Sequence, residues 1–356
     1  MKINKTENIQ LLAFGMSTSY MLICSAIALF NFNFAAALFV LGSLFISKIH
    51  PFQYWILVVA LLIKSQNDIT LSSSDLESYL YLYNSIEKGY NPFQYGFAYK
   101  GPEVLLPAFF WLLSIFAPTL TINQMSFIFI LLFSILFYPI AKKFTNTPII
   151  FISLVVLIDV ILVVHLFRQC ISSLILLFAI INFTKKDRRN KFKGLLLYLI
   201  AGFTHSTNFL FGIFGTSSTY TSVKYLKLFL VVSAIVGFYG IQYDLFAKIS
   251  SFTYDETILR KANYGLSLVG IYGGQIRIIG LISAGLSLLV FNSHPLFRIY
   301  LFFAALGLFF YQVPILAPRI GLISSSILTG LPIGLFLNAL KGLIVNKKLN
   351  YFYAKS

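Results

Sequence analysis

Three arginines adjoin long apolar segments, away from the lysine-rich clusters of the chain. Arg168 precedes Gln169 between two apolar runs, Arg277 follows a Gly-Gly pair, and Arg319 follows a proline. Arginine stays charged, and its planar guanidinium group binds phosphate oxygens in pairs. If the helices that carry these residues are neighbours, the three arginines form a cationic pocket for a phosphate group. The alternative is that each one anchors a helix at the lipid headgroup level.

Three other side chains are candidates for proton transfer. Asp75 begins a segment in which Tyr79 and Tyr83 follow at intervals of four, which puts all three on one face of a predicted helix. Glu103 opens an apolar run, and His205 interrupts another. Either carboxylate could activate a hydroxyl group or bind one, or it could simply favour a helix N-terminus. His205 is either a packing residue or the mark of a substrate path.

The composition is that of a chain surrounded by lipid. Of its 356 residues, 58% are hydrophobic, 17% aromatic and 11% charged, and the mean hydropathy is +0.84. A soluble domain carries about 25% charged residues, and about 20 apolar residues cross a bilayer. The composition predicts an all-α, polytopic integral membrane protein. Residues 1–356 would form a single transmembrane domain of about 11–12 helices, with a re-entrant or broken helix and an outer-face cavity.

The candidate spans follow from the apolar runs. They cover residues 9–30, 34–47, 51–63, 121–141, 148–166, 169–184, 194–215, 227–246, 275–292, 296–313 and 320–340. The net charge of +16 comes from basic residues in the loops between these runs. Such clusters are typical of the cytoplasmic loops of membrane proteins, so nucleic acid is not an expected partner.

The basic clusters predict an orientation. Residues 185–193 hold six cations and are expected to form a cytoplasmic loop. The other clusters agree with this placement if residues 104–118 form a re-entrant or interfacial segment. They also require that 194–215 consists of two half-helices that meet at a polar break over 202–208.

With this orientation, two polar regions lie on the periplasmic side. One is the acidic, tyrosine-rich loop 64–103, and the other is the loop 247–274. Cys24 and Cys170 are far apart in apolar segments, so neither a disulfide framework nor a zinc site is predicted. No metal and no cofactor are expected.

Over residues 50–215 the chain resembles the EpsG-like and Wzy-type polysaccharide polymerases. The resemblance rests on Asp75-x3-Tyr79, Glu103 before an apolar segment, Arg168-Gln169 at the start of a span, a basic loop, and Ala201-Gly-Phe-Thr-His205-Ser. In the histidine group, this chain carries an inserted threonine, Thr204.

The resemblance implies a multi-pass enzyme of the bacterial inner membrane, a glycosyltransferase that uses no nucleotide-sugar donor. Such enzymes join oligosaccharide repeat units carried on undecaprenyl pyrophosphate into O-antigen of lipopolysaccharide, capsule or exopolysaccharide at the periplasmic face. A chain-length regulator and a flippase are the protein partners it implies. The implied roles are pyrophosphate binding and leaving-group stabilisation by Arg168, Arg277 and Arg319; acceptor activation by Asp75, Glu103 or His205; and substrate contacts by Gln169, Tyr79 and Tyr83.

Other classes remain open. A multi-span transporter or flippase of lipid-linked sugars would use the broken helix and Asp159, the acid deepest in an apolar run, which could otherwise pair with a neighbouring helix. Paired interruptions in two halves of the chain would favour a transporter, and they are not apparent. An O-antigen ligase would carry a larger late outer loop than 247–274, and a non-catalytic scaffold would leave the arginines without a role.

Overall fold

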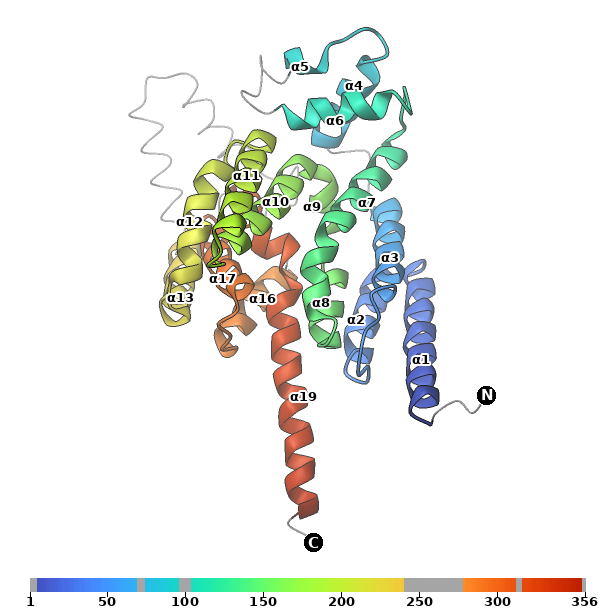
Figure 1. Cartoon of the computed structure of the whole chain (residues 1–356), viewed down its shortest axis with the longest axis vertical. Coiled ribbons are helices and arrows are strands. Elements are labelled where there is room, and N and C mark those ends of the chain that lie inside the picture. Colours follow the sequence, from blue (N-terminus) through green and yellow to red (C-terminus); the bar gives the residue numbers. More distant parts are fainter. Residues whose placement is uncertain (1–4, 69–73, 96–103, 240–277, 312–315, 354–356) are drawn as a thin grey trace.

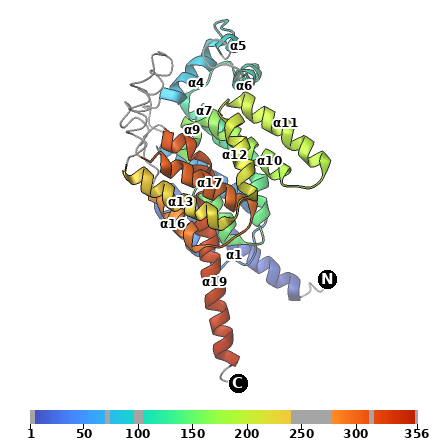
Figure 2. The same ribbon diagram turned by 90° about the vertical axis from the view of Figure 1, so that its left-hand side faces the viewer.

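The structure is a computed structural model that describes residues 5–68, 74–95, 104–239, 278–311 and 316–353 (Figure 1). The described residues are helical throughout their regular structure and contain no strand. The predicted all-α class is therefore confirmed. The start of α1 and the end of α19 lie at the same end of the molecule, opposite α4, α5 and α6 (Figures 1 and 2).

The first helix packs against each of the next two. The three helices are α1 (Lys5–Ala28), α2 (Phe32–Gly42) and α3 (Gln53–Asp68). Gln53 joins α3 to α1, because its buried amide donates to Ser17 Oγ at 2.7 Å and to Thr18 Oγ1 at 2.9 Å. The side chain of Asn31 caps α2 by accepting the backbone N–H of Phe34.

Three short helices, within residues 74–95 and 104–114, form a cap over one end of the molecule. They are α4 (Ser74–Ser85), α5 (Pro92–Tyr95) and α6 (Leu105–Ser114) (Figure 1). With ten residues, α6 is only about 15 Å long, roughly half the thickness of the hydrocarbon core. The predicted re-entrant or interfacial character of 104–118 agrees with this length, although the placement of the segment relative to a bilayer stays a prediction.

The middle of the chain runs from the cap into the centre of the molecule. It comprises α7 (Ile122–Ala141), the short turn η2 (Lys142–Phe144), α8 (Pro148–Val156), α9 (Val160–His165) and α10 (Phe167–Phe183). The run 148–166, predicted as one candidate span, is divided into two helices by a break between α8 and α9, and whether it crosses a membrane stays a prediction. Asp159 starts the second piece, since its Oδ1 accepts the backbone N–H of Leu162 at 3.2 Å.

The break predicted within 194–215 is present. The helix α11 (Arg188–Thr204) ends at the polar stretch, and α12 (Asn208–Tyr220) begins three residues after His205. Next comes α13 (Val223–Tyr239), which packs against α17 (Pro295–Phe309). The shorter α16 (Ile278–Leu289) precedes α17 in the chain.

The last third also differs from the predicted continuous span 320–340. It contains α18 (Leu316–Ile320), a π-helix (Ile323–Ile327) and α19 (Gly330–Tyr353). In the π-helix, the backbone N–H of Leu328 donates to Ile323 at 2.8 Å. This bond spans five residues instead of four, and π-turns of this kind are frequent at functional sites.

The helices α19 and α8 approach each other closely at two glycines one turn apart. A methyl group on Gly330 would lie 1.9 Å from the carbonyl oxygen of Ser153, and one on Gly334 would lie 2.7 Å from the Cα of Ile150. This spacing of small residues is the common arrangement for close backbone contact between membrane helices. The contact fixes the end of α8 that leads into the break before α9.

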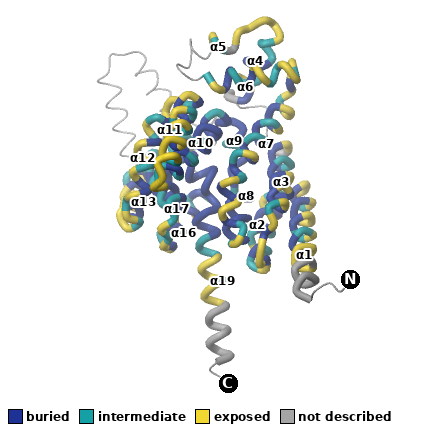
Figure 3. Tube along the Cα trace, in the orientation of Figure 1, coloured by how far each residue is buried: buried dark blue, intermediate teal, exposed yellow. Residues whose placement is uncertain are grey.

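Burial is concentrated in α8, α10, α17 and the π-helix, whereas the peripheral helices expose large apolar side chains (Figure 3). Phe192, Ile213 and Phe238, on α11, α12 and α13, are each more than half exposed. Exposed apolar surfaces of this extent mark contact with membrane or partners. In the described part of the chain one helix, residues 122–144, is long and apolar enough to cross a bilayer, and several apolar helices are shorter.

Candidate functional site

The start of α10 meets α18 in a buried contact. The amide of Gln169 is 6% exposed, and its Nε2 donates to the backbone carbonyl oxygen of Arg319 at 2.6 Å. These residues are 150 positions apart in sequence. Arg168 immediately precedes Gln169, and both arginine side chains are partly exposed. Two of the three predicted arginines therefore belong to segments that the fold brings together.

The packing of α11 on α10 gives the level of His205 along this helix pair. These helices are antiparallel neighbours, and a methyl group on Gly194 would touch Ala179 and Phe183 of α10. His205 follows Gly194 by eleven residues. Because α11 runs antiparallel to α10, it lies beside a part of α10 that is about eleven residues nearer the start of that helix. This register puts His205 near the level of Gln169.

The packing of α12 on α10 gives the same result independently. A methyl group on Gly212 would approach Leu176, and one on Gly215 would approach Ile180. Both helices therefore run in the same direction with an almost constant offset. One helical turn before Gly212, the same offset pairs Asn208 with Ser172. The 205–207 turn then lies beside the first turn of α10.

His205 terminates α11 and begins the turn. Its backbone N–H donates to Ala201 at 2.9 Å, and its ring Nδ1 lies 2.7 Å from Thr207 Oγ1. Which of these two atoms donates depends on the tautomer of the ring. If Nδ1 carries the proton, Nε2 is the basic nitrogen; if Thr207 donates, Nε2 carries the proton and is a donor.

Asn208 is a site residue that the sequence did not single out. Its side chain is fully buried, and neither of its polar atoms has a hydrogen-bond partner among the described residues. Leaving a buried amide unsatisfied costs about 1–3 kcal/mol, so such groups call for an explanation. The signal in the sequence is that Asn208 is the last residue of the polar stretch 202–208. In the structure, Asn208 is also the first residue of α12.

Asp159 lies where two interrupted helices meet. Its side chain is 3% exposed and caps α9, while its backbone carbonyl accepts the hydroxyl of Ser326 in the π-helix at 3.3 Å. A capping carboxylate satisfies backbone N–H groups that would otherwise lack a partner at depth in the protein. The structure thus gives Asp159 a role in holding the helix break.

Aromatic rings connect the cap to the start of α10. Tyr79 and Tyr83 of α4 both lie edge-on to Phe110 of α6. Tyr79 also contacts Phe129, whose ring stacks on that of Phe167 with 3.7 Å between centroids. Because Phe167 precedes Arg168, this column of rings fixes the position of the cap relative to the arginine.

The two predicted tyrosines differ in exposure. Tyr83 is fully buried and donates its hydroxyl to the backbone carbonyl of Ala117, and burial raises the pKa of that hydroxyl. Its ring and hydroxyl are both used in packing, so the predicted substrate contact of Tyr83 does not fit this geometry. Tyr79 keeps part of its surface exposed and stays a candidate.

Several predicted site elements lie outside the described residues. They are Glu103, Arg277, the loop 247–274 and the side chain of Asp75, although the backbone of Asp75 lies in the first turn of α4. Two cavities in the described part of the chain are lined by residues other than the predicted site residues. The predicted outer-face cavity therefore stays a prediction. Within the described residues, no group of three acidic, histidine or cysteine side chains could hold a metal ion.

Comparison with known proteins gives the family. The model of the EpsG family matches residues 51–329, most of the chain, so this chain belongs to the EpsG family. This family is similar to the Wzy-type polysaccharide polymerases, and its members are membrane proteins. No curated protein and no solved structure matches the chain. The matched region includes α3 to the π-helix and leaves α1, α2 and α19 outside.

Proposed function

We propose that this protein joins oligosaccharide repeat units carried on undecaprenyl pyrophosphate into a long polysaccharide at the periplasmic face of a bacterial inner membrane. The observation that carries the proposal is the contact between Gln169 and Arg319 in a chain of the EpsG family. It holds the segment of Arg168 beside the segment of Arg319, so the proposal needs both guanidinium groups to reach one pyrophosphate group from these segments.

The reaction is a glycosyl transfer. A hydroxyl group of the acceptor sugar attacks the anomeric carbon of the donor, and the bond from that carbon to the pyrophosphate oxygen breaks. The carrier lipid leaves with its pyrophosphate, while the hydroxyl proton passes to a base. Arg168 and Arg319, together with Arg277, stabilise the negative charge that develops on the leaving oxygen.

His205 is our first choice for the base among the described residues. The packing of α11 and α12 on α10 supports a position for His205 beside the first turn of α10, and its ring contacts Thr207. Base catalysis requires the tautomer in which Nδ1 donates to Thr207, so that Nε2 accepts the hydroxyl proton. Asp75 and Glu103 remain the alternatives for this role, from the periplasmic loop 64–103.

The remaining groups would bind the substrates. The amide of Asn208 is fully buried but has no partner among the described residues, so we propose that it binds a hydroxyl or phosphate oxygen of the lipid-linked sugar when the 205–207 turn opens, as both a donor and an acceptor. Tyr79 offers an aromatic surface for a sugar ring. The product would be O-antigen, capsule or exopolysaccharide, with a chain-length regulator and a flippase acting with the polymerase.

The test is complementation of a deletion strain, with surface glycans separated on a gel and protein levels measured in the membrane. We expect Arg168→Ala and Arg319→Ala to leave glycans of a single repeat unit, since removal of one such electrostatic contact slows a reaction by about 10²–10³-fold. Arg189→Ala, in the basic loop, is the matched control and should restore the full ladder. A wild-type ladder from Arg168→Ala would refute the proposal.

The alternatives predict other patterns in the same experiment. Loss of all glycans that contain repeat units would indicate a flippase or an O-antigen ligase. A transporter of lipid-linked sugars would draw on the buried carboxylate of Asp159, although its capping bond to Leu162 already accounts for its position.

A further inference from the structure

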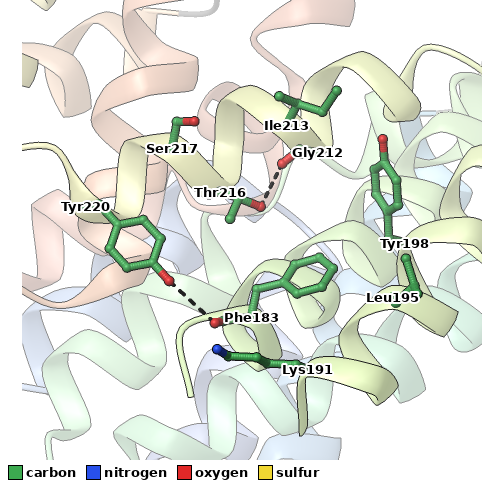
Figure 4. Close-up of a pocket in the computed structure, with 9 residues that line it drawn as sticks. All are labelled: Phe183, Lys191, Leu195, Tyr198, Gly212, Ile213, Thr216, Ser217 and Tyr220. Atoms are coloured by element: carbon green, nitrogen blue, oxygen red, sulfur yellow. Dashed lines mark hydrogen bonds between the residues drawn. The ribbon is translucent and has the colours of Figure 1, made fainter. Parts of the chain in front are cut away.

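A cavity of about 510 Å³ opens between α10, α11 and α12, at the end of these helices opposite the Gln169–Arg319 contact. It is lined by Phe183, Lys191, Leu195, Tyr198, Gly212, Ile213, Thr216, Ser217 and Tyr220 (Figure 4). The α12 side chains lie across the cavity from Lys191 and Leu195 of α11 (Figure 4). This volume is within the range of small-molecule sites.

The part of the cavity towards the middle of the helices is apolar. Leu195 and Ile213 are 46% and 61% exposed. The hydroxyl groups of this part bond to the protein itself: Thr216 donates to the carbonyl of Gly212 at 2.7 Å, and Tyr198 donates to that of Phe209. With their polar atoms satisfied, these walls present mainly carbon to an occupant.

The other part of the cavity is polar and positively charged. The hydroxyl of Tyr220 donates to the carbonyl of Phe183 at 3.4 Å, and the side chain of Lys191 lies beside Phe183 (Figure 4). Lys191 lies in the first turn of α11, within the basic segment 185–193 that holds six cations and one acid. That acid, Asp187, caps α11 and accepts the side-chain amide of Asn190 at 3.0 Å.

An occupant must therefore combine an anionic group with an apolar chain. Phe192, Leu196 and Phe214, each next in sequence to a residue of the cavity wall, are also exposed, and exposed apolar side chains of this kind are suited to contact with lipid. Anionic phospholipids of the cytoplasmic leaflet have this chemistry, and basic clusters beside membrane helices attract them.

We propose that this cavity binds one anionic phospholipid, with an acyl chain along Leu195 and Ile213 and the headgroup phosphate beside Lys191. The site depends on the predicted cytoplasmic placement of 185–193 but not on the polymerase reaction. The lipid would bridge α11 and α12, the two helices that carry the His205–Asn208 turn at their other ends. It would thereby hold the hairpin closed.

The test is native mass spectrometry of the full-length protein in detergent, with phosphatidylglycerol or phosphatidylcholine added. We expect one retained phosphatidylglycerol and little phosphatidylcholine. Lys191→Ala should lower phosphatidylglycerol occupancy about fivefold, the effect of one cation near an anionic headgroup. Lys224→Ala removes an exposed lysine of α13 outside the cavity and should bind as the wild type does.

A second variant keeps the charge and blocks the space. Ser217 is exposed on the cavity wall, so Ser217→Phe fills the cavity without entering the core, and it should abolish the retained lipid. Equal retention of the two phospholipids, or wild-type phosphatidylglycerol binding in both Lys191→Ala and Ser217→Phe, would overturn the proposal. Because no glycan takes part, the result is independent of the proposed polymerase activity.

Discussion

The close contact between α19 and α8 makes Gly330→Ala a severe test of the fold. The added methyl carbon would lie 1.9 Å from the carbonyl oxygen and 2.3 Å from the carbonyl carbon of Ser153, whereas ordinary contacts begin at 3.4 Å. Both are backbone atoms of a helix, so they cannot rotate away as a side chain can. The two helices must separate, and this separation also loosens the packing around Gly334.

The size of the effect follows from two opposing terms. Overpacking of a well-packed interior costs about 1–3 kcal/mol, and a backbone clash of this depth belongs at the upper end. Alanine has a better helix propensity than glycine by about 1 kcal/mol. The net loss should therefore be about 2 kcal/mol. Because α8 leads to the break at Asp159 and on to α10, the shift also reaches the Gln169–Arg319 contact.

The assay is thermal unfolding of the detergent-purified protein, followed by the glycan ladder in the complemented deletion strain. We expect a lower unfolding temperature and shorter chains for Gly330→Ala. Gly342→Ala is the matched control on the same helix, because its methyl group would meet no atom within 4 Å; it should unfold at or above the wild-type temperature. If Gly330→Ala unfolds as the wild type does, the packing of α19 on α8 is not as described.

Two further substitutions test the site. Gln169→Leu removes the donor to the Arg319 carbonyl, which should cost about 1–3 kcal/mol and shorten the glycan chains; an unchanged unfolding temperature and ladder would contradict this role. Asp159→Asn keeps an oxygen that can cap α9 and should preserve both stability and glycans, whereas Asp159→Ala should lose about 1 kcal/mol. Loss of glycans in a stable Asp159→Asn protein would instead favour a transporter.

Local sequence signals predicted several elements correctly. The polar residues of 202–208 indicated a helix break, and α11 and α12 meet there. The four-residue spacing of Asp75, Tyr79 and Tyr83 indicated a helix, which is α4. The short apolar run after Glu103 gave the ten-residue α6. In each case the signal is carried by residues adjacent in sequence, so hydropathy and spacing are sufficient to read it.

Other features escaped prediction because their cause is not local. The run 148–166 is apolar apart from a few residues. Its hydropathy does not show whether Asp159 caps a second helix or pairs with a neighbouring helix. The π-helix at Ile323–Ile327 likewise interrupts the span predicted over 320–340, because three serines within a mainly apolar run do not by themselves show that the helix widens there. Tyr83 shares both the spacing of Tyr79 and the contact with Phe110, yet Tyr83 is fully buried and Tyr79 is partly exposed. Which of two similar residues is buried depends on the neighbours that the fold supplies.

The sequence by itself determined the helical class, the family and the types of residue available for chemistry, because composition and short motifs express these directly. Only the tertiary structure decided that Gln169 meets the carbonyl of Arg319, 150 residues away, and that Asn208 is buried with its amide unsatisfied by the described residues. The physical reason is that such contacts depend on helix register and close packing. The register and the closeness of two helices depend on all the residues in their interface. The glycines that let α19 approach α8 are one example.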